Sequence, residues 1–370
     1  LLAETNIRAC TMQVIQWHHL PAFFPVTGGD LPFDILSASF YLLSRYEEYL
    51  PVETDLHGRY PHTASLAWQH QFLSKPLVDL WALQVKEELR LKFPTLTFQS
   101  NTARFVPTYD IDIAYSYLGK PWLLQIGGGL RDIIRADLKR LRMRMQVLQK
   151  KRSDPYDAYD WLHDLHHSCQ VTPLYFMLIG PPHPFNKNLS VTHPLMQALL
   201  HRLKQEGPLG LHPSYDTMHH PDILQHELHQ LPARISRQHY IRFALPQTFR
   251  ALLQAGIEAD YSMGYGSING FRASTSFPFP WFDLEKNECT TLMLYPFCFM
   301  ECNSFFEQRQ SLEATKKELD QLQQQVGNVG GVLISIWHNF SLGTDLQWQG
   351  WRDMYATWMR NLPQGGFALT

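Results

Sequence analysis

The chain has 370 residues, which is long enough for two domains because single domains run to about 100–200 residues. Its composition, 45% hydrophobic and 13% aromatic, is typical of a packed globular protein and excludes a disordered one. The formal net charge of −2 argues against a dedicated nucleic-acid-binding protein, which carries a strongly basic balance. The five cysteines are scattered and form no C-x-x-C pair, so they indicate free thiols in a reducing compartment.

No apolar run reaches the ~18 residues that a transmembrane helix needs, so no transmembrane segment is expected. No basic-then-apolar leader is visible at the start of the chain. The sequence therefore favours a cytoplasmic over an exported protein.

Two amphipathic helices are predicted near the amino terminus. Apolar residues recur with helical spacing over 31–50 and again over 76–92, and a turn at 57–61 separates the two segments. These elements predict a small α/β N-terminal domain over residues 1–100, followed by a larger domain over 101–370. In the first helix, three charged residues are expected to form ion pairs on the helix surface: Arg45, Glu47 and Glu48.

A strand that ends in two aspartates, Asp110 and Asp112, is predicted next. Residues two apart on a strand face the same side, so both carboxylates are delivered to one place. Apolar neighbours make this segment a strand edge that opens into a pocket, and a turn with two solvated aspartates is the alternative. Two carboxylates held together cannot both ionise without cost, so a bound metal ion or a shared proton is expected there.

The following segment is strongly basic, with nine Lys/Arg against two Asp over residues 131–152. It predicts a basic helical insertion around 129–152, with a solvated charged face and with leucines and methionines that pack inward. A basic platform that docks on an anionic surface, ligand or polymer is the alternative. The glycines at 127–129 match neither a dinucleotide-binding nor a Walker phosphate loop.

From residue 153 onward, strand and helix patterns alternate. Strands are predicted at 173–180, 208–212, near 239–244, near 257–260 and at 331–337. Helices are predicted at 155–168, 194–206, 221–231, 246–255 and 308–326. Such alternation is typical of a parallel sheet or barrel with helices outside, in which the chemistry collects at the carboxyl ends of the strands.

Side chains suited to hydrolysis occupy those strand ends. They are His212 and Asp216, Arg237 and His239, Asp260, and His338. Together with Asp110 and Asp112 they supply what a hydrolytic metal site requires, because neutral imidazole and carboxylate suit a borderline divalent ion such as Zn²⁺. Such an ion acidifies a water, and a carboxylate that does not bind the ion takes the proton.

In this order the motifs from about residue 104 to 345 resemble those of the polysaccharide deacetylase (NodB-like carbohydrate esterase) family. The resemblance implies a deformed (β/α)7 barrel. It also implies a role for each matching residue: Asp110 as the base, Asp112 as a metal ligand, Arg237 as the residue that orients the base, Asp260 as the aspartate of the fourth motif, and His338 as the general acid.

The second motif of the family departs in this chain. His212 matches its first ligand, but Asp216 stands where a second histidine is expected. Either Asp216 binds the metal, or His239 supplies the third ligand, or the site binds metal weakly or not at all. His239 is favoured because an imidazole from an adjacent strand completes a set of two histidines and one carboxylate with an open position.

The chain also resembles, over nearly its whole length, a subgroup of such proteins with an N-terminal domain of unknown function. Strings that carry this resemblance include Ser44–Glu48, Gly210–Tyr215, Asp260–Tyr265, Gly270–Ala273 and Trp337–Asn339. Four residues are candidates for substrate binding: Tyr215, Arg272, Tyr265 and Trp337. Core packing is the alternative for the aromatic residues, and bracing of Asp283 or Glu301 is the alternative for Arg272.

The resemblance implies a metal-dependent hydrolase that removes an acetyl or similar acyl group from a carbohydrate, either a glycan or a glycan precursor. The expected cofactor is Zn²⁺, with Co, Ni or Mn as alternatives. The rival hypothesis is a catalytically degenerate barrel that binds a glycan or another protein without turnover.

Overall fold

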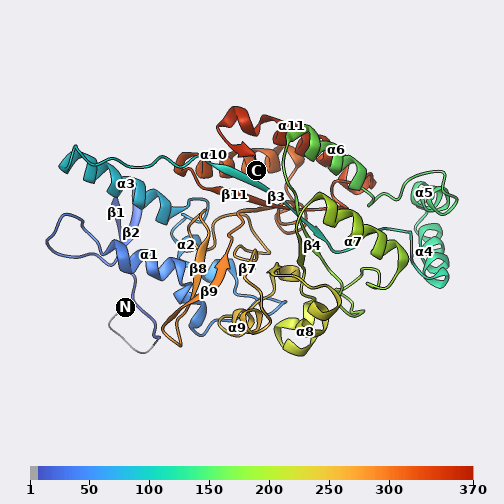
Figure 1. Cartoon of the computed structure of the whole chain (residues 1–370), viewed down its shortest axis with the longest axis horizontal. Helices are drawn as coiled ribbons and strands as arrows, with labels where there is room; N and C mark the ends of the chain where they lie inside the picture. Colours follow the sequence, from blue (N-terminus) through green and yellow to red (C-terminus); the bar gives the residue numbers. More distant parts are fainter. Residues whose placement is uncertain (1–6, 370) are drawn as a thin grey trace.

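The computed structural model describes residues 7–369, which fold into a mixed α/β protein (Figure 1). Within that range no helix is both long and apolar enough to cross a membrane. The structure contains two main hydrophobic cores. One is built from residues before position 100 together with Tyr265, and the other lies around the large sheet that follows.

The N-terminal segment combines a short hairpin with three helices. Its elements are β1 (Val14–Trp17), β2 (Leu20–Phe23), α1 (Ile35–Leu43), α2 (Leu66–Gln69) and α3 (Leu77–Lys92). Aromatic side chains fill its core, with Trp81 packed against Phe23 and Phe33. The prediction of one helix over 31–50 is wrong in extent, because Arg45 takes a left-handed backbone conformation and α1 ends at Leu43. The division of the chain at residue 100 stays a prediction.

The large sheet is open, with strand order β10-β11-β3-β4-β5-β6-β7-β9-β8, and β12 pairs with β3. Its strands are β3 (Arg104–Ile111), β4 (Leu174–Met177), β5 (Leu209–Leu211), β6 (Ile235–Ser236), β7 (Ala259–Asp260), β8 (Phe279–Asp283), β9 (Glu288–Leu294), β10 (Phe299–Met300), β11 (Val332–His338) and β12 (Ala368–Leu369). All of the pairs are parallel except β8 with β9. The structure thus confirms an α/β fold with a curled half-barrel sheet, but it does not confirm the expected (β/α)7 barrel.

Helices surround this sheet. They are α4 (Trp122–Ile134), α5 (Leu138–Leu148), α6 (Tyr159–Cys169), α7 (Pro194–Glu206), α8 (Pro221–Gln230), α9 (Gln247–Gln254), α10 (Leu312–Val329) and α11 (Trp351–Asn361). Short 3-10 turns lie at Tyr46–Tyr49, His62–Ala64, Tyr215–Met218, His239–Ile241, Leu346–Trp348 and Leu362–Gly365, with a π-helical turn at Asn303–Glu307. Helices α4 and α5 stand apart from the others at the edge of the molecule (Figure 1).

Two sequence predictions need correction here. The strand expected near 239–244 is the shorter β6 at 235–236, and the chain then turns because Tyr240 adopts a left-handed conformation. The inward packing expected for the leucines and methionines of the basic insertion is wrong for most of them, since Leu130, Leu138, Met145 and Leu148 are exposed and only Met143 is buried. A left-handed Ala136 separates α4 from α5.

The parallel arrangement places the ends of the central strands along one edge of the sheet. Strand β11 is buried along its whole length and pairs in register with β3, so that His338 lies opposite Asp110. The ladder continues past the short strands, because the His212 amide donates to the Met177 carbonyl and the Arg237 amide to the Leu211 carbonyl. The backbone hydrogen bonds therefore fix the positions of the Cα atoms of His338, His212 and Arg237 at this edge of the sheet.

Candidate metal-binding site

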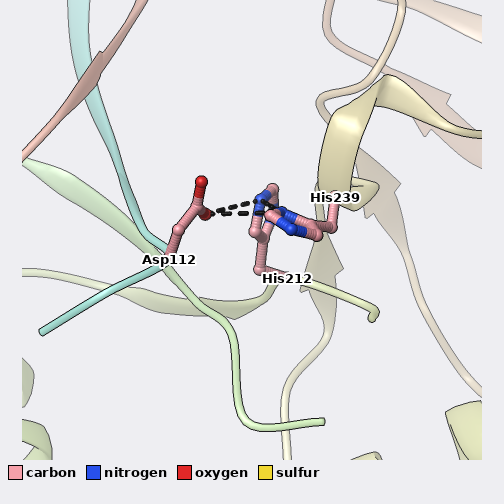
Figure 2. A group of neighbouring side chains, drawn as sticks. All are labelled: Asp112, His212 and His239. Carbon is pink, nitrogen blue, oxygen red and sulfur yellow. Dashed lines mark hydrogen bonds and ion pairs between the residues drawn. The ribbon is translucent and has the colours of Figure 1, made fainter. Parts of the chain in front are cut away.

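Three potential metal ligands converge at this edge of the sheet. Asp112 follows β3, His212 follows β5, and His239 follows β6, and their side chains point toward one another (Figure 2). The Asp112 Oδ1 atom lies 3.2 Å from His212 Nε2 and 3.4 Å from His239 Nδ1. The two ring nitrogens are 3.1 Å apart. These three side chains form a group that could hold a metal ion.

The hydrogen bonds of the two histidines determine which ring nitrogens face each other as acceptors. His212 Nδ1 lies 2.5 Å from the Arg237 carbonyl oxygen, and His239 Nε2 lies 3.0 Å from the Phe185 carbonyl oxygen. A carbonyl oxygen only accepts hydrogen bonds, so both of these nitrogens donate. In the neutral rings the other two nitrogens therefore carry lone pairs, and these lone pairs face each other across 3.1 Å.

Asp112 completes a triangle of acceptors. Its buried Oδ1 has no hydrogen-bond donor among the described residues. Four ligands placed tetrahedrally at about 2.0–2.1 Å from a zinc ion are roughly 3.3–3.4 Å apart, which is close to the three observed separations. Three acceptors held together at that spacing repel one another until a cation or a proton lies between them. The donor set therefore fits a borderline divalent ion.

Positive charge beside Asp112 dominates its ionisation. Burial alone would raise the pKa of this carboxyl group, but the positive charges that His239 and His338 carry when protonated hold it well below its ordinary value. Asp112 is accordingly a carboxylate at neutral pH, which is the form that binds metal.

Asp110 lies beside this triangle and is held by Arg237. The guanidinium Nη1 donates to Asp110 Oδ1 at 2.8 Å, while Asp110 Oδ2 is 3.8 Å from His212 Nε2. Arg237 is itself fixed by a hydrogen bond from Nε to the Tyr261 carbonyl and by stacking over the Phe176 ring. One carboxylate oxygen of Asp110 is thus anchored, and the other faces the metal ligands.

His338 also lies beside the triangle and is oriented by the carboxylate of Glu301. Glu301 Oε1 accepts hydrogen bonds from the backbone amide of His338 at 2.7 Å and from its Nδ1 at 2.9 Å, and Ser341 Oγ donates to the same oxygen. His338 Nε2 therefore points toward Asp112 Oδ2, 3.5 Å away. Burial would lower the pKa of His338, but the negative charges of Glu301 and Asp112 raise it well above its ordinary value.

Glu301, Cys302 and His338 also form a group that could hold a metal ion. Glu301 Oε1 accepts three hydrogen bonds, while its buried Oε2 has no donor among the described residues. The cysteine makes this group the poorer site. Burial raises the pKa of the Cys302 thiol to about 12, so it is not the thiolate that binds metal.

A cavity of about 240 Å³ opens onto these side chains. Asp110, Asp112, His212, His239 and His338 all contribute to its lining. Aromatic rings form much of the remaining wall, namely Phe185, Tyr240, Phe306 and Phe340. The cavity thus combines the ligand cluster, its polar floor, with aromatic rings and with further polar side chains such as Arg59, Lys187 and Gln238. Apolar surface with a few placed polar groups is the general form of a small-molecule site.

Two predicted site residues lie away from this cluster. Asp216 sits on the turn after His212 with its carboxylate 3.8 Å from His183 Nε2, and it belongs to neither potential metal group. Asp260 is fully buried, accepts hydrogen bonds from Ser236 Oγ and the Ser262 amide, and does not line the cavity. The structure therefore brings His239 to the ligand triangle and leaves Asp216 outside it.

The structure also does not bring the four predicted substrate-binding residues to the cavity lining. Trp337, Tyr265 and Arg272 are buried in the interior. Arg272 braces Glu48 of the N-terminal segment, with Nη2 to Oε2 at 2.6 Å, and neither Asp283 nor Glu301. Tyr215 stacks against Phe185 and so supports the cavity wall from behind.

Sequence reasoning missed several residues of the site. Glu301 orients His338 from 37 positions away, and no local motif joins the two. Phe185 and Tyr240 come from loops whose apolar character looks the same as that of core residues. The ion pairs expected on a helix surface at Arg45, Glu47 and Glu48 are instead buried, because Arg272 and Tyr265 pack over them.

Comparisons with known proteins give few matches. Residues 1–94 match the model of a family described as a family of unknown function, DUF7033. No curated protein matches the chain. Among solved structures, the chain is similar to a "putative polysaccharide deacetylase from Mycobacterium smegmatis", with 10% sequence identity, a TM-score of 0.46, and coverage of 74% of this chain and 89% of the other.

Proposed function

We propose that this chain is a metal-dependent hydrolase that removes an acetyl or similar acyl group from a glycan or glycan precursor. One observation carries the metal dependence. Two imidazole lone pairs and one carboxylate oxygen without a donor face a common point at separations of 3.1–3.4 Å. A divalent cation, Zn²⁺ first, is the species that such a donor set stabilises.

When bound, such an ion acidifies a water and polarises an acyl oxygen. Asp112, His212 and His239 would hold it. Asp110 is the residue placed to accept the proton from the attacking water, because its second oxygen faces the ligand triangle while Arg237 holds the first.

His338 is the residue placed to protonate the leaving group. Glu301 binds its Nδ1, so Nε2 is directed toward Asp112 of the ligand triangle. Glu301 and Asp112 raise the pKa of His338 well above its ordinary value, which favours the protonated ring that a general acid needs. The proposed base and the proposed acid thus each lie beside a ligand side chain, Asp110 at 3.8 Å from His212 and His338 at 3.5 Å from Asp112.

The sugar part of the substrate is supported by the aromatic lining of the cavity and by the motif resemblance. Phe185, Tyr240 and Phe340 present apolar ring surface at the cavity. The nonpolar faces of a pyranose pack on such rings, while the acyl group reaches the polar floor.

The test is a paired measurement of metal content and acetate release from N-acetylated and O-acetylated oligosaccharides. The purified protein is reconstituted with zinc before both measurements. We expect Asp110→Asn to reduce acetate release by about 10²–10⁴-fold while bound zinc stays stoichiometric. Loss of zinc from this variant would contradict the role of Asp110 as a base that does not bind metal.

The matched control is Asp260→Asn, which changes a buried aspartate outside the cavity. It is expected to retain zinc and more activity than Asp110→Asn. A wild-type protein that takes up no zinc after reconstitution would overturn the proposal and favour a binding protein without turnover.

A further inference from the structure

Helix α4 carries an exposed apolar stripe. Its members lie at spacings that place them on one side of a helix turning about 100° per residue. They are 56–75% exposed and comprise Trp122, Leu123, Ile126, Leu130, Ile133 and Ile134. Isolated apolar residues are common on protein surfaces, but a continuous stripe of this length on one helix marks an interaction surface.

The polarity of α4 is inverted relative to an ordinary surface helix. Its inward side is polar, because the buried Asp132 pairs with Arg144 of α5 and Gln125 also accepts from that guanidinium. A Cβ at Gly128 would lie 2.6 Å from Arg144, so this glycine permits the close approach. The polar contacts hold the two helices together while the apolar side of α4 faces outward.

The segment that carries the stripe is also rich in cations. Residues 120–152 contain ten Lys/Arg and two Asp, a net charge of +8, in a chain whose overall net charge is −2. Eight of these cations form no ion pair with a described residue, and seven of the eight are exposed: Arg131, Arg135, Lys139, Arg142, Lys150, Lys151 and Arg152. Exposed apolar residues continue onto α5 at Leu138, Met145 and Leu148.

We propose that the α4–α5 hairpin docks on an anionic lipid surface. A bilayer offers a partner for each part of this surface. The apolar stripe would be buried at the boundary between headgroups and hydrocarbon, and the cations would pair with acidic headgroups. An anionic polymer would satisfy the cations only and leave the stripe in water. A second copy of the chain would bring its own +8 charge against this one, which opposes pairing.

The hairpin has a small core of its own. Met143 and Val147 of α5 pack with Tyr117, and the Arg144 guanidinium lies over the Tyr117 ring. The cleft under α4 shares two lining residues, Ile113 and Lys187, with the catalytic cavity. Docking would therefore hold the cavity close to the lipid surface, although the inference does not depend on the proposed hydrolase activity.

The test is co-sedimentation of the full chain with vesicles. We expect binding to phosphatidylcholine vesicles that contain about a third phosphatidylglycerol, and much weaker binding to pure phosphatidylcholine. Ile126→Gln combined with Ile133→Gln is expected to lower the partition coefficient about tenfold or more. Arg135→Gln and Arg142→Gln are expected to lower it about fivefold each, and added salt acts in the same direction.

The matched control is Leu56→Gln combined with Leu91→Gln, at apolar residues that are 94% and 80% exposed outside the hairpin. This control is expected to bind as the wild type does. Equal sedimentation of the wild type and the double isoleucine variant would overturn the proposal, as would failure of the wild type to bind anionic vesicles. Binding to polyphosphate but not to vesicles would assign an anionic polymer, and a dimer lost in the isoleucine variant would assign a second copy; either result would also overturn it.

Discussion

Two clusters of buried polar side chains in this molecule differ in whether their members have partners within the chain. At the contact between the N-terminal segment and the large sheet, Glu48 lies between Arg45 and Arg272. Its Oε1 accepts from Arg45 Nε at 2.6 Å and from Arg272 Nε at 2.8 Å, and its Oε2 accepts from Arg272 Nη2 at 2.6 Å. Burial opposes its charge, but the two guanidiniums hold the pKa of Glu48 below its ordinary value.

The cluster at the cavity is not balanced in this way. Its two imidazoles present lone pairs to each other, and Asp112 Oδ1 has no hydrogen-bond donor in the described part of the chain. Charges that are matched by fixed partners act as structure, since nothing further can bind to them. At the cavity, by contrast, the surrounding fold holds hydrogen-bond acceptors close together without a cation. This arrangement favours a ligand from outside the chain, such as a metal ion.

Removal of Glu48 is the largest expected perturbation of stability. Glu48→Ala leaves two buried guanidiniums without their shared carboxylate, so we expect a loss of about 3–5 kcal/mol in the free energy of unfolding. Chemical denaturation monitored by circular dichroism measures this loss. Glu87→Ala is the control, because the exposed Glu87–Arg90 pair is worth about 0–1 kcal/mol. If both variants lost the same free energy of unfolding, the buried cluster would stabilise the fold no more than an exposed ion pair does, which would contradict the prediction.

Glu227 offers the opposite case of a buried carboxyl group that lacks a cationic partner. Its Oε2 accepts from the Ser214 amide, and burial raises its pKa from 4.5 to about 7. Between those two pH values the native state binds more protons than the unfolded state, so stability falls as pH rises through this window. Glu227→Gln should abolish that fall and stabilise the protein by up to about 3 kcal/mol at pH 8.

The measurement for Glu227 is the free energy of unfolding at pH 5 and at pH 8 for both proteins. The gain at pH 8 should shrink at pH 5, where the native carboxyl group is already protonated. A gain that is the same at both pH values would mean that packing, and not ionisation, explains the effect. Glu48→Gln, at a carboxylate with two cations, should destabilise at both values.

The sequence predicted the central strands because their apolar runs are bounded by turn residues. Buried β11 and β3, the strand that carries Asp110, follow that rule. It predicted less well where tertiary contacts override local pattern. Arg45 looks like a surface charge in a helix, yet Arg272, 227 residues away in the chain, makes its environment a buried one.

At the candidate site, too, local sequence pattern predicted some residues, whereas others depend on contacts between distant parts of the chain. Asp110, Asp112, His212 and His338 lie at strand ends, and a parallel sheet brings strand ends together, so their proximity could be predicted. The choice between Asp216 and His239 could not be made from spacing, because it depends on the turn at Tyr240 that directs His239 inward. The exposure of the apolar side of α4 was also hidden, since a helical period shows that one side is apolar but not which way it faces.

Zinc should stabilise the cavity cluster and leave the Arg45–Glu48–Arg272 cluster unaffected. A ligand that binds only the native state adds about 2.7 kcal/mol to the free energy of unfolding at a hundred times its dissociation constant. We expect this increment in the wild type and equally in Glu48→Ala, because the two clusters share no residue. His239→Ala should lose most of it, since it removes one of three ligands.

Asp216→Asn separates the two candidates for the third ligand. Asp216 is partly exposed, and its contact with His183 Nε2 at 3.8 Å is worth about 0–1 kcal/mol, so the unfolding free energy without zinc should barely change. The zinc increment should remain that of the wild type, because His239 and not Asp216 lies 3.4 Å from Asp112. If Asp216→Asn removed the increment and His239→Ala kept it, the loop that carries Asp216 would have to move to the ion on binding, and the ligand triangle of the structure would be the wrong one.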